Sequence, residues 1–148
     1  MKTKHLLQAF ISGNPFPQSE IDEVRKTVDF RAAIQSHLNF KYAVVSAMEG
    51  RQNKELPGPI GCSDSCNLGR WMNETATIYF GELKAFDQLK AEHRRFHQAA
   101  KEVVELQQAG QSARAKDVFK RDFEPSSRRI VSWIQHLDDL FGSSSRRV

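Results

Sequence analysis

Residues 83–104 read LKAFDQLKAEHRRFHQAAKEVV, and an apolar side chain recurs in this run every three or four positions. That spacing places the apolar side chains on one face of a helix. We therefore expect a long helix from about Thr77 to Ala109. Gly110 should end it, because glycine readily adopts the left-handed conformation that follows many helices. The inner face of this helix would carry Leu83, Phe86, Leu89, Phe96, Ala100 and Val103.

The same period appears in two other long segments. One runs from Ser19, a residue type that caps helices, to about residue 50. The other spans about 112–141 and contains Pro125, which we expect to kink the helix or divide it in two. A loop rich in glycine, proline and serine covers residues 50–66, and a short helix restarts at Asn67. No strand alternation is found. The sequence therefore predicts an all-α fold, an antiparallel four-helix bundle with a short helix following the Cys-containing loop.

The length of the chain, 148 residues, suits a single domain. We divide it into an N-terminal extension (1–18), a helical bundle (19–141) and a disordered tail (142–148). Hydrophobic residues make up 39% of the chain and charged residues 27%, a balance that supports a compact core rather than disorder.

Composition and charge exclude several classes of partner. No apolar run approaches the roughly 20 residues that span a membrane, and the N-terminus lacks the pattern of a signal peptide. We therefore expect a cytoplasmic protein that does not enter membranes. The net charge of +4 comes from separated basic pairs rather than a basic stripe with interleaved aromatic residues. This pattern predicts solvated helix faces and no nucleic-acid binding.

Three histidines fall on apolar helix faces. His93 and His97 are four residues apart on the 77–109 helix, so both project from its apolar stripe. His37 lies on the apolar face of the first long helix, between Ile34 and Leu38. Each buried imidazole needs a polar partner, because an unpaired one costs about 1–3 kcal/mol. Two interpretations follow: three separately satisfied core histidines, or one shared metal ion.

Cys66 supplies a fourth candidate ligand. It immediately precedes the short helix, and Zn²⁺ prefers four tetrahedral ligands of nitrogen and sulfur type. The N-terminus of a helix should also lower the pKa of this thiol and favour the thiolate that binds metal. Cys62 precedes Cys66 by four residues. It is either a resolving thiol for an oxidised Cys66 or an ordinary loop thiol. We expect Trp71 to pack against the bundle, and Trp133 either to do the same or to form part of a dimer face.

Three blocks of this sequence resemble the signature of the chemoreceptor zinc-binding domain family. In that family, a His is followed by an aromatic and a basic residue three and four positions on. A Cys-x-Leu-Gly-x-Trp block and a His-x-x-x-His block come after it. Here the blocks are His37 with Phe40 and Lys41, then Cys66 to Trp71, then His93 to His97. Phe40 stands where the family commonly has Trp, which keeps an aromatic ring. The resemblance covers about residues 20–141.

The resemblance implies a four-helix bundle that holds Zn²⁺ through His37, Cys66, His93 and His97. Members of the family are regulatory inputs of chemoreceptors and diguanylate cyclases, and they are often dimeric. They respond to zinc, or to oxidants such as hypochlorous acid at the zinc-bound thiolate. For this chain the resemblance implies a sensory domain, a homodimer, and a chemotaxis or cyclic-di-GMP signalling partner.

We do not expect an enzyme. A site with four protein ligands leaves no open coordination position for a substrate or water. Arg94 follows His93, where a zinc protease has a catalytic Glu. Two alternatives remain: a purely structural zinc bundle that serves assembly, and a hemerythrin-like di-iron bundle. The second would need bridging carboxylates and more histidines than the three that face inward.

Overall fold

The computed structural model describes residues 16–50 and 60–142, and within these ranges the regular secondary structure is entirely helical. The predicted extension (1–18) and tail (142–148) lie almost wholly outside the described residues. The elements are α2 (Gln18–Thr27), α3 (Phe30–Met48), α4 (Asn67–Trp71), α5 (Thr77–Phe80), α6 (Lys84–Gln108), α7 (Ser112–Val118) and α8 (Glu124–Leu140). Two π-helical segments, η1 (Met72–Ala76) and η2 (Phe119–Phe123), connect α4 to α5 and α7 to α8.

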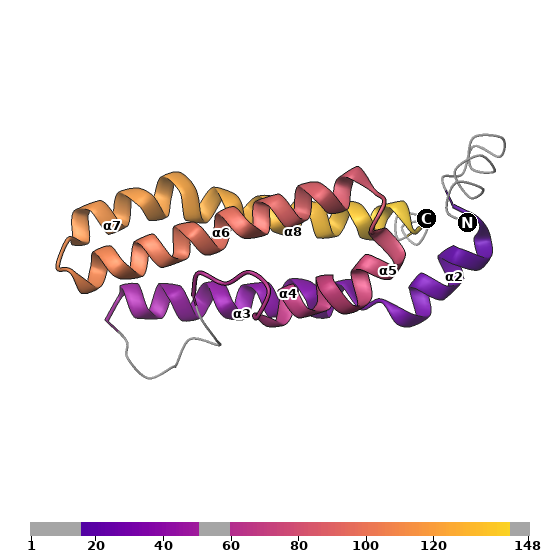
Figure 1. Cartoon of the computed structure of the whole chain (residues 1–148), viewed down its shortest axis with the longest axis horizontal. Coiled ribbons are helices and arrows are strands. Elements are labelled where there is room, and N and C mark those ends of the chain that lie inside the picture. The colour runs from indigo at the N-terminus through magenta and orange to yellow at the C-terminus, as the bar shows by residue number, and fades with distance from the viewer. Residues whose placement is uncertain (1–15, 51–59, 143–148) are drawn as a thin grey trace.

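The helices after α2 form four rods, which run up and down along one axis (Figure 1). The rods are α3, α4–η1–α5, α6 and α7–η2–α8, and each runs opposite to the one before it in the chain. α6 contacts both α8 and α3, and α3 also contacts α4 and α8. The predicted all-α antiparallel bundle is confirmed. No helix among the described residues is long and apolar enough to cross a bilayer.

The first long helix is divided, contrary to the sequence prediction of one helix from Ser19 to about residue 50. α2 starts after Pro17, whose carbonyl accepts hydrogen bonds from the backbone of the first turn. Val28 and Asp29 are extended, with ψ angles of 121° and 90°. The Asp29 side chain then caps α3 by accepting a 2.9 Å hydrogen bond from the Ala32 N–H. A strong capping residue therefore starts a new helix where the apolar period alone predicts continuation.

The prediction that the second long helix begins at Thr77 is wrong: α6 begins at Lys84, and residues 77–80 complete the rod that starts with α4. The chain reverses at Gly81, where a Cβ would lie 2.5 Å from the Thr77 carbonyl oxygen. Only glycine allows that approach. The short helix after the Cys-containing loop is in this way extended into the second of the four rods.

The helix ends at residues 50 and 110 and the division near Pro125 are confirmed. Gly50 and Gly110 both have a φ of 75°, the left-handed conformation in which glycine ends helices. η2 precedes Pro125, which lies in the first turn of α8, where its missing N–H costs no helical hydrogen bond. The π-helical segment η2 separates α7 from α8.

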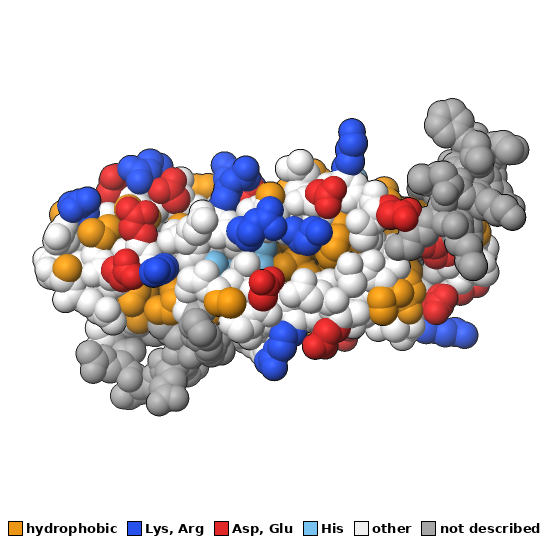
Figure 2. Space-filling view, viewed as in Figure 1, with side chains coloured by type: hydrophobic (Ala, Val, Ile, Leu, Met, Phe, Trp, Pro, Cys, Tyr) orange, Lys and Arg blue, Asp and Glu red, His pale blue; other side chains and the backbone are white. Residues whose placement is uncertain are grey.

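The core fills the space between the rods with large apolar side chains. Phe80, Phe86, Phe96, Phe123 and Phe141 are almost fully buried, and Trp71 and Trp133 pack against this core, as predicted. At one end, the Arg25 guanidinium donates hydrogen bonds to the Asp138 carboxylate and to the Phe141 carbonyl, so α2 is held against the end of α8. Basic and acidic side chains are interspersed on the face shown in Figure 2.

Candidate metal centre

Cys66 is the N-cap of α4, and its sulfur is held by the backbone of the helix it starts. The Gly69 N–H donates a 3.2 Å hydrogen bond to Cys66 Sγ. Gly69 has no room for a side chain, because a Cβ there would overlap the Ser63 carbonyl group, with the Asp64 carbonyl carbon 3.1 Å away. The Cys-x-x-Gly spacing therefore brings the 63–65 turn against α4 and fixes the position of the sulfur.

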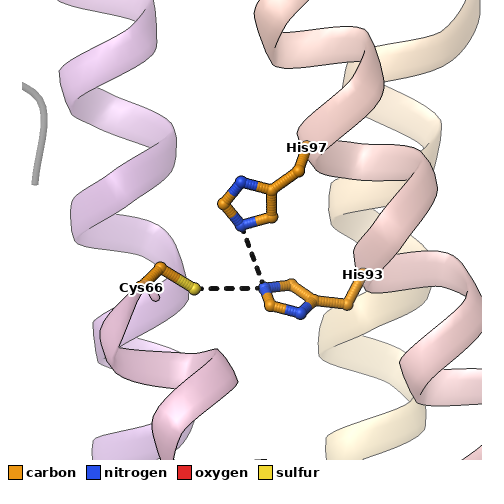
Figure 3. A group of neighbouring side chains, drawn as sticks. All are labelled: Cys66, His93 and His97. Carbon is orange, nitrogen blue, oxygen red and sulfur yellow. Dashed lines mark hydrogen bonds between the residues drawn. The ribbon is translucent and has the colours of Figure 1, made fainter. Parts of the chain in front are cut away.

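His93 and His97 project from α6 toward this sulfur (Figure 3). Cys66 Sγ lies 3.3 Å from His93 Nε2, which lies 3.1 Å from His97 Nε2. These three ligand atoms all lie within 4.8 Å of one another, and each side chain is at most 4% exposed. The prediction that the His pair faces the core and meets Cys66 is confirmed.

The orientation of His97 is set by a backbone carbonyl from the loop before α4. His97 Nδ1 lies 2.6 Å from the Ile60 carbonyl oxygen. A carbonyl oxygen only accepts, so Nδ1 carries the proton and Nε2 keeps its lone pair for the cluster. A carbonyl or carboxylate partner of this kind usually orients metal-binding histidines. The role of Ile60 has no signal in the sequence, because any residue type offers the same carbonyl.

His37 is buried beside the cluster but is not one of the three grouped residues. Its Nε2 lies 2.8 Å from Ser127 Oγ on α8, and its ring contacts the Phe96 ring edge-on at 4.6 Å between centroids. It is 1% exposed. The structure thus brings together three of the four predicted ligands. The role of His37 as the fourth stays a prediction.

Burial keeps the three imidazoles neutral. Desolvation lowers the pKa of both His37 and His93 to about 3, and it also lowers the pKa of His97. Neutral imidazole is the form that binds metal. The Cys66 thiol differs from the sequence expectation: burial raises its pKa and outweighs the hydrogen bonds from the backbone of Gly69 and Leu68, which lower it. The helix start lowers the pKa of the Cys66 thiol, as predicted, but by less than burial raises it.

Acidification is expected to destabilise the chelator-treated protein steeply. His37 and His93 have folded-state pKa values of about 3 against an ordinary value of 6.5, so the unfolded chain binds more protons below pH 6.5. Their contribution to stability is complete above pH 6.5 and is lost as the pH falls toward 3, at up to about 1.4 kcal/mol per pH unit for each histidine. Urea unfolding between pH 7.5 and 4 measures the slope. In the matched variant His37→Gln, the slope should correspond to about one fewer proton taken up on unfolding. Equal slopes in the wild type and in His37→Gln would contradict the lowered folded-state pKa of His37.

A buried carboxylate lies next to the cluster on α6. Glu92 Oε1 accepts hydrogen bonds from Ser126 Oγ at 2.8 Å and from Arg129 at 3.1 Å, and Oε2 accepts one from Arg95 at 2.9 Å. The contacts with Ser126 and Arg129 join α6 to the first two turns of α8. The sequence interpretation missed this residue, although its spacing from Leu89 and Phe96 places it on the apolar stripe.

The donor set fits zinc. One sulfur and two imidazole nitrogens, buried and close together, match the ligand types and spacing that Zn²⁺ prefers. Among the described residues, this group contains no carboxylate, which a di-iron centre needs as a bridging ligand. The hemerythrin-like alternative would need bridging carboxylates that this group does not supply.

Comparison with known protein families agrees with this chemistry. Residues 37–104 match the model of the chemoreceptor zinc-binding domain. The matched segment begins at His37 and includes Cys66, His93 and His97. No curated protein and no solved structure is detectably similar to the chain. The motif blocks, the Cys–His–His cluster and the segment that matches the chemoreceptor zinc-binding domain coincide within residues 37–104.

Proposed function

We propose that this domain binds one Zn²⁺ through Cys66, His93, His97 and His37 and acts as a regulatory, sensory module rather than an enzyme. The observation that carries the proposal is the buried group of Cys66 Sγ, His93 Nε2 and His97 Nε2. His37 is included because it is buried and because its charge affects that of His93 and His97, so it lies near this group.

Bound zinc would stabilise the Cys66 thiolate in a site where burial alone favours the thiol. The chain's own contacts make Cys66 the ligand that is easiest to release. His37, His93 and His97 lie within the long helices α3 and α6, whereas Cys66 lies at the junction of a turn and a five-residue helix. Loss of zinc, or oxidation of Cys66, would uncouple the start of α4 from α6. Local unfolding of residues 60–76 is the signal that we propose.

The output of this signal is proposed from the family. The family name associates the domain with chemoreceptors. A homodimeric, cytoplasmic protein that acts on a chemoreceptor or a diguanylate cyclase partner is the form we propose for this chain. The proposal of no enzymatic activity rests on the closed four-ligand site. A structural zinc bundle that serves assembly is the alternative.

Elemental analysis of the purified protein, without added metal, tests the metal site. We expect about one zinc per chain in the wild type, and much less in Cys66→Ala and His97→Ala. His136→Ala is the matched control, because His136 is exposed on α8. Absence of zinc from the wild type would overturn the proposal. Full zinc content in His37→Ala would remove only His37 from the ligand set.

Hydrogen exchange separates sensing from assembly. Addition of a chelator or an oxidant should raise the exchange of residues 60–76 while α6 and α8 stay protected. Exchange and partner binding that do not respond to either treatment would favour the structural alternative.

A further inference from the structure

Both cysteine sulfurs contact the same three-residue turn, Ser63–Ser65. On one side, the Ser65 side chain and the backbone of Asp64 and Ser65 make hydrogen bonds to the Cys62 sulfur. On the other side, Cys66 Sγ lies 3.8 Å from the Ser63 carbonyl oxygen. The two sulfurs are close enough for the charge of one to affect the other. The turn therefore holds two thiols at its ends, and only Cys66 belongs to the metal centre.

The two thiols differ in their access to solvent. Cys66 is 4% exposed, whereas Cys62 is only partly buried and lines an open cavity of about 600 Å³. Gln98 and Lys101 of α6 form part of the opposite wall of that cavity. The hydrogen bonds from the turn lower the pKa of the Cys62 thiol, which increases the fraction present as the reactive thiolate. A small oxidant arriving from solvent meets Cys62 before it meets Cys66.

We propose that Cys62 and Cys66 form a redox-active dithiol in which a peroxide-class oxidant reacts at Cys62 and Cys66 then closes a disulfide across the Ser63–Ser65 turn. The consequence for zinc rests on the proposed function, because the disulfide removes the Cys66 sulfur from the cluster with His93 and His97. The formation of the disulfide itself does not require zinc.

The chemistry balances in two steps. The Cys62 thiolate attacks one oxygen of hydrogen peroxide, the O–O bond breaks, and the products are a Cys62 sulfenic acid and hydroxide. The Cys66 thiolate then attacks the Cys62 sulfur, the S–O bond breaks, and a second hydroxide leaves. The two protons that the thiols release neutralise the two hydroxide ions. In sum, two thiols are oxidised to one disulfide and one peroxide is reduced to two waters.

The geometry explains why the disulfide would also disturb α4. A disulfide requires Cα atoms about 4.4–6.8 Å apart, a span that a turn of three intervening residues can close. Cys66 Sγ would have to rotate away from the Gly69 N–H, which is its capping contact. The same event would therefore remove a metal ligand and the N-cap of the short helix.

Peptide mapping of the full chain tests the proposal. The zinc-loaded protein is treated with graded hydrogen peroxide, free thiols are alkylated, and the chain is cleaved before Asp64, which separates the two cysteines. We expect the two fragments to remain joined until a reductant is added, with an intact mass about 2 Da below that of the dithiol protein. A zinc-binding dye added in parallel should report release of zinc at the same rate.

Cys62→Ser is the matched control, because Cys62 is outside the metal cluster and partly exposed. This variant should fold and hold zinc like the wild type, form no disulfide, and accumulate higher oxidation states of Cys66 only at greater oxidant doses. Separated fragments in the oxidised wild type, with Cys66 carrying oxygen and Cys62 still alkylated, would overturn the dithiol proposal and leave the zinc-sensing proposal intact. Disulfides between two chains would also overturn it. Repeating the mapping on chelator-treated protein shows whether the disulfide forms even if the zinc proposal fails.

Discussion

Gly69→Ala is expected to destabilise the protein by about 3 kcal/mol or more, which is near the upper end for overpacking and typical of severe substitutions. Helix propensity alone predicts the opposite sign, because alanine is favoured over glycine within helices by about 1 kcal/mol. The steric argument outweighs propensity here. The new methyl group would overlap the Ser63 carbonyl group and approach the Asp64 carbonyl carbon to 3.1 Å, and both are backbone atoms that cannot rotate away. The 63–65 turn must move, and it carries the Cys66 sulfur with it.

Urea unfolding with and without a chelator measures this effect, and zinc content reports the displacement of the sulfur. Gly110→Ala is the matched control. Its φ of 75° disfavours alanine, but no atom lies within 4 Å of the added Cβ, so a smaller cost of about 1–2 kcal/mol and unchanged zinc content are expected. If Gly69→Ala is as stable as the wild type and retains zinc, the turn does not pack against α4 as described.

The candidate site was predicted from the sequence to the extent that it depends on local spacing. The i, i+4 spacing of His93 and His97 places both rings on one helix face whatever the rest of the fold does. Cys66 could be assigned to the helix start because the glycine- and serine-rich loop ends there. These signals are short-range, and the structure brings these three residues together.

The partners of the site could not be predicted because they come from distant segments. Ser127 is 90 residues from His37, and the Ile60 carbonyl that orients His97 is a backbone group without a residue signature. The pKa of Cys66 also depended on tertiary burial, which outweighs the local effect of the helix start. Glu92 is a different case, because its spacing places it on the apolar stripe, although carboxylates are rarely buried without a partner.

The fold was predicted at the level of rods but not of helix ends. Apolar periodicity marks which faces are buried, and it continues across residues 28–29 because Val28 is itself buried. The break depends instead on the capping contact of Asp29. The start of α6 depends likewise on a close approach at Gly81, which becomes visible only in three dimensions. Caps and close backbone contacts decide helix ends, whereas the hydrophobic pattern decides which segments associate.

Phe96→Ala is expected to lower the free energy of unfolding by about 3–5 kcal/mol and to weaken zinc binding by about 10- to 100-fold. Phe96 is fully buried, and its ring contacts His37 at 4.6 Å and His97 at 5.5 Å between centroids. Its ring also stacks on the ring of Phe123, at 4.7 Å between centroids. Removing the ring leaves a cavity between two imidazoles of the proposed site. Both rings then gain rotational freedom that must be lost again when they bind a metal.

Phe86→Ala separates the loss of support for the imidazoles from a general loss of stability. Phe86 lies on the same helix and is 1% exposed, but its aromatic contact is with Phe80, away from the metal cluster. Its substitution should cost a similar free energy of unfolding and leave the zinc affinity unchanged under native conditions. Competition with a chelator of known affinity measures the difference, and Phe96→Leu provides a milder variant that keeps the core filled. Equal weakening of zinc binding in the Phe86 and Phe96 variants would mean that stability alone controls the site. A selective effect at Phe96 would mean that the aromatic core of α6 orients the ligands, so that the packing of the bundle and the binding of its metal are one coupled property.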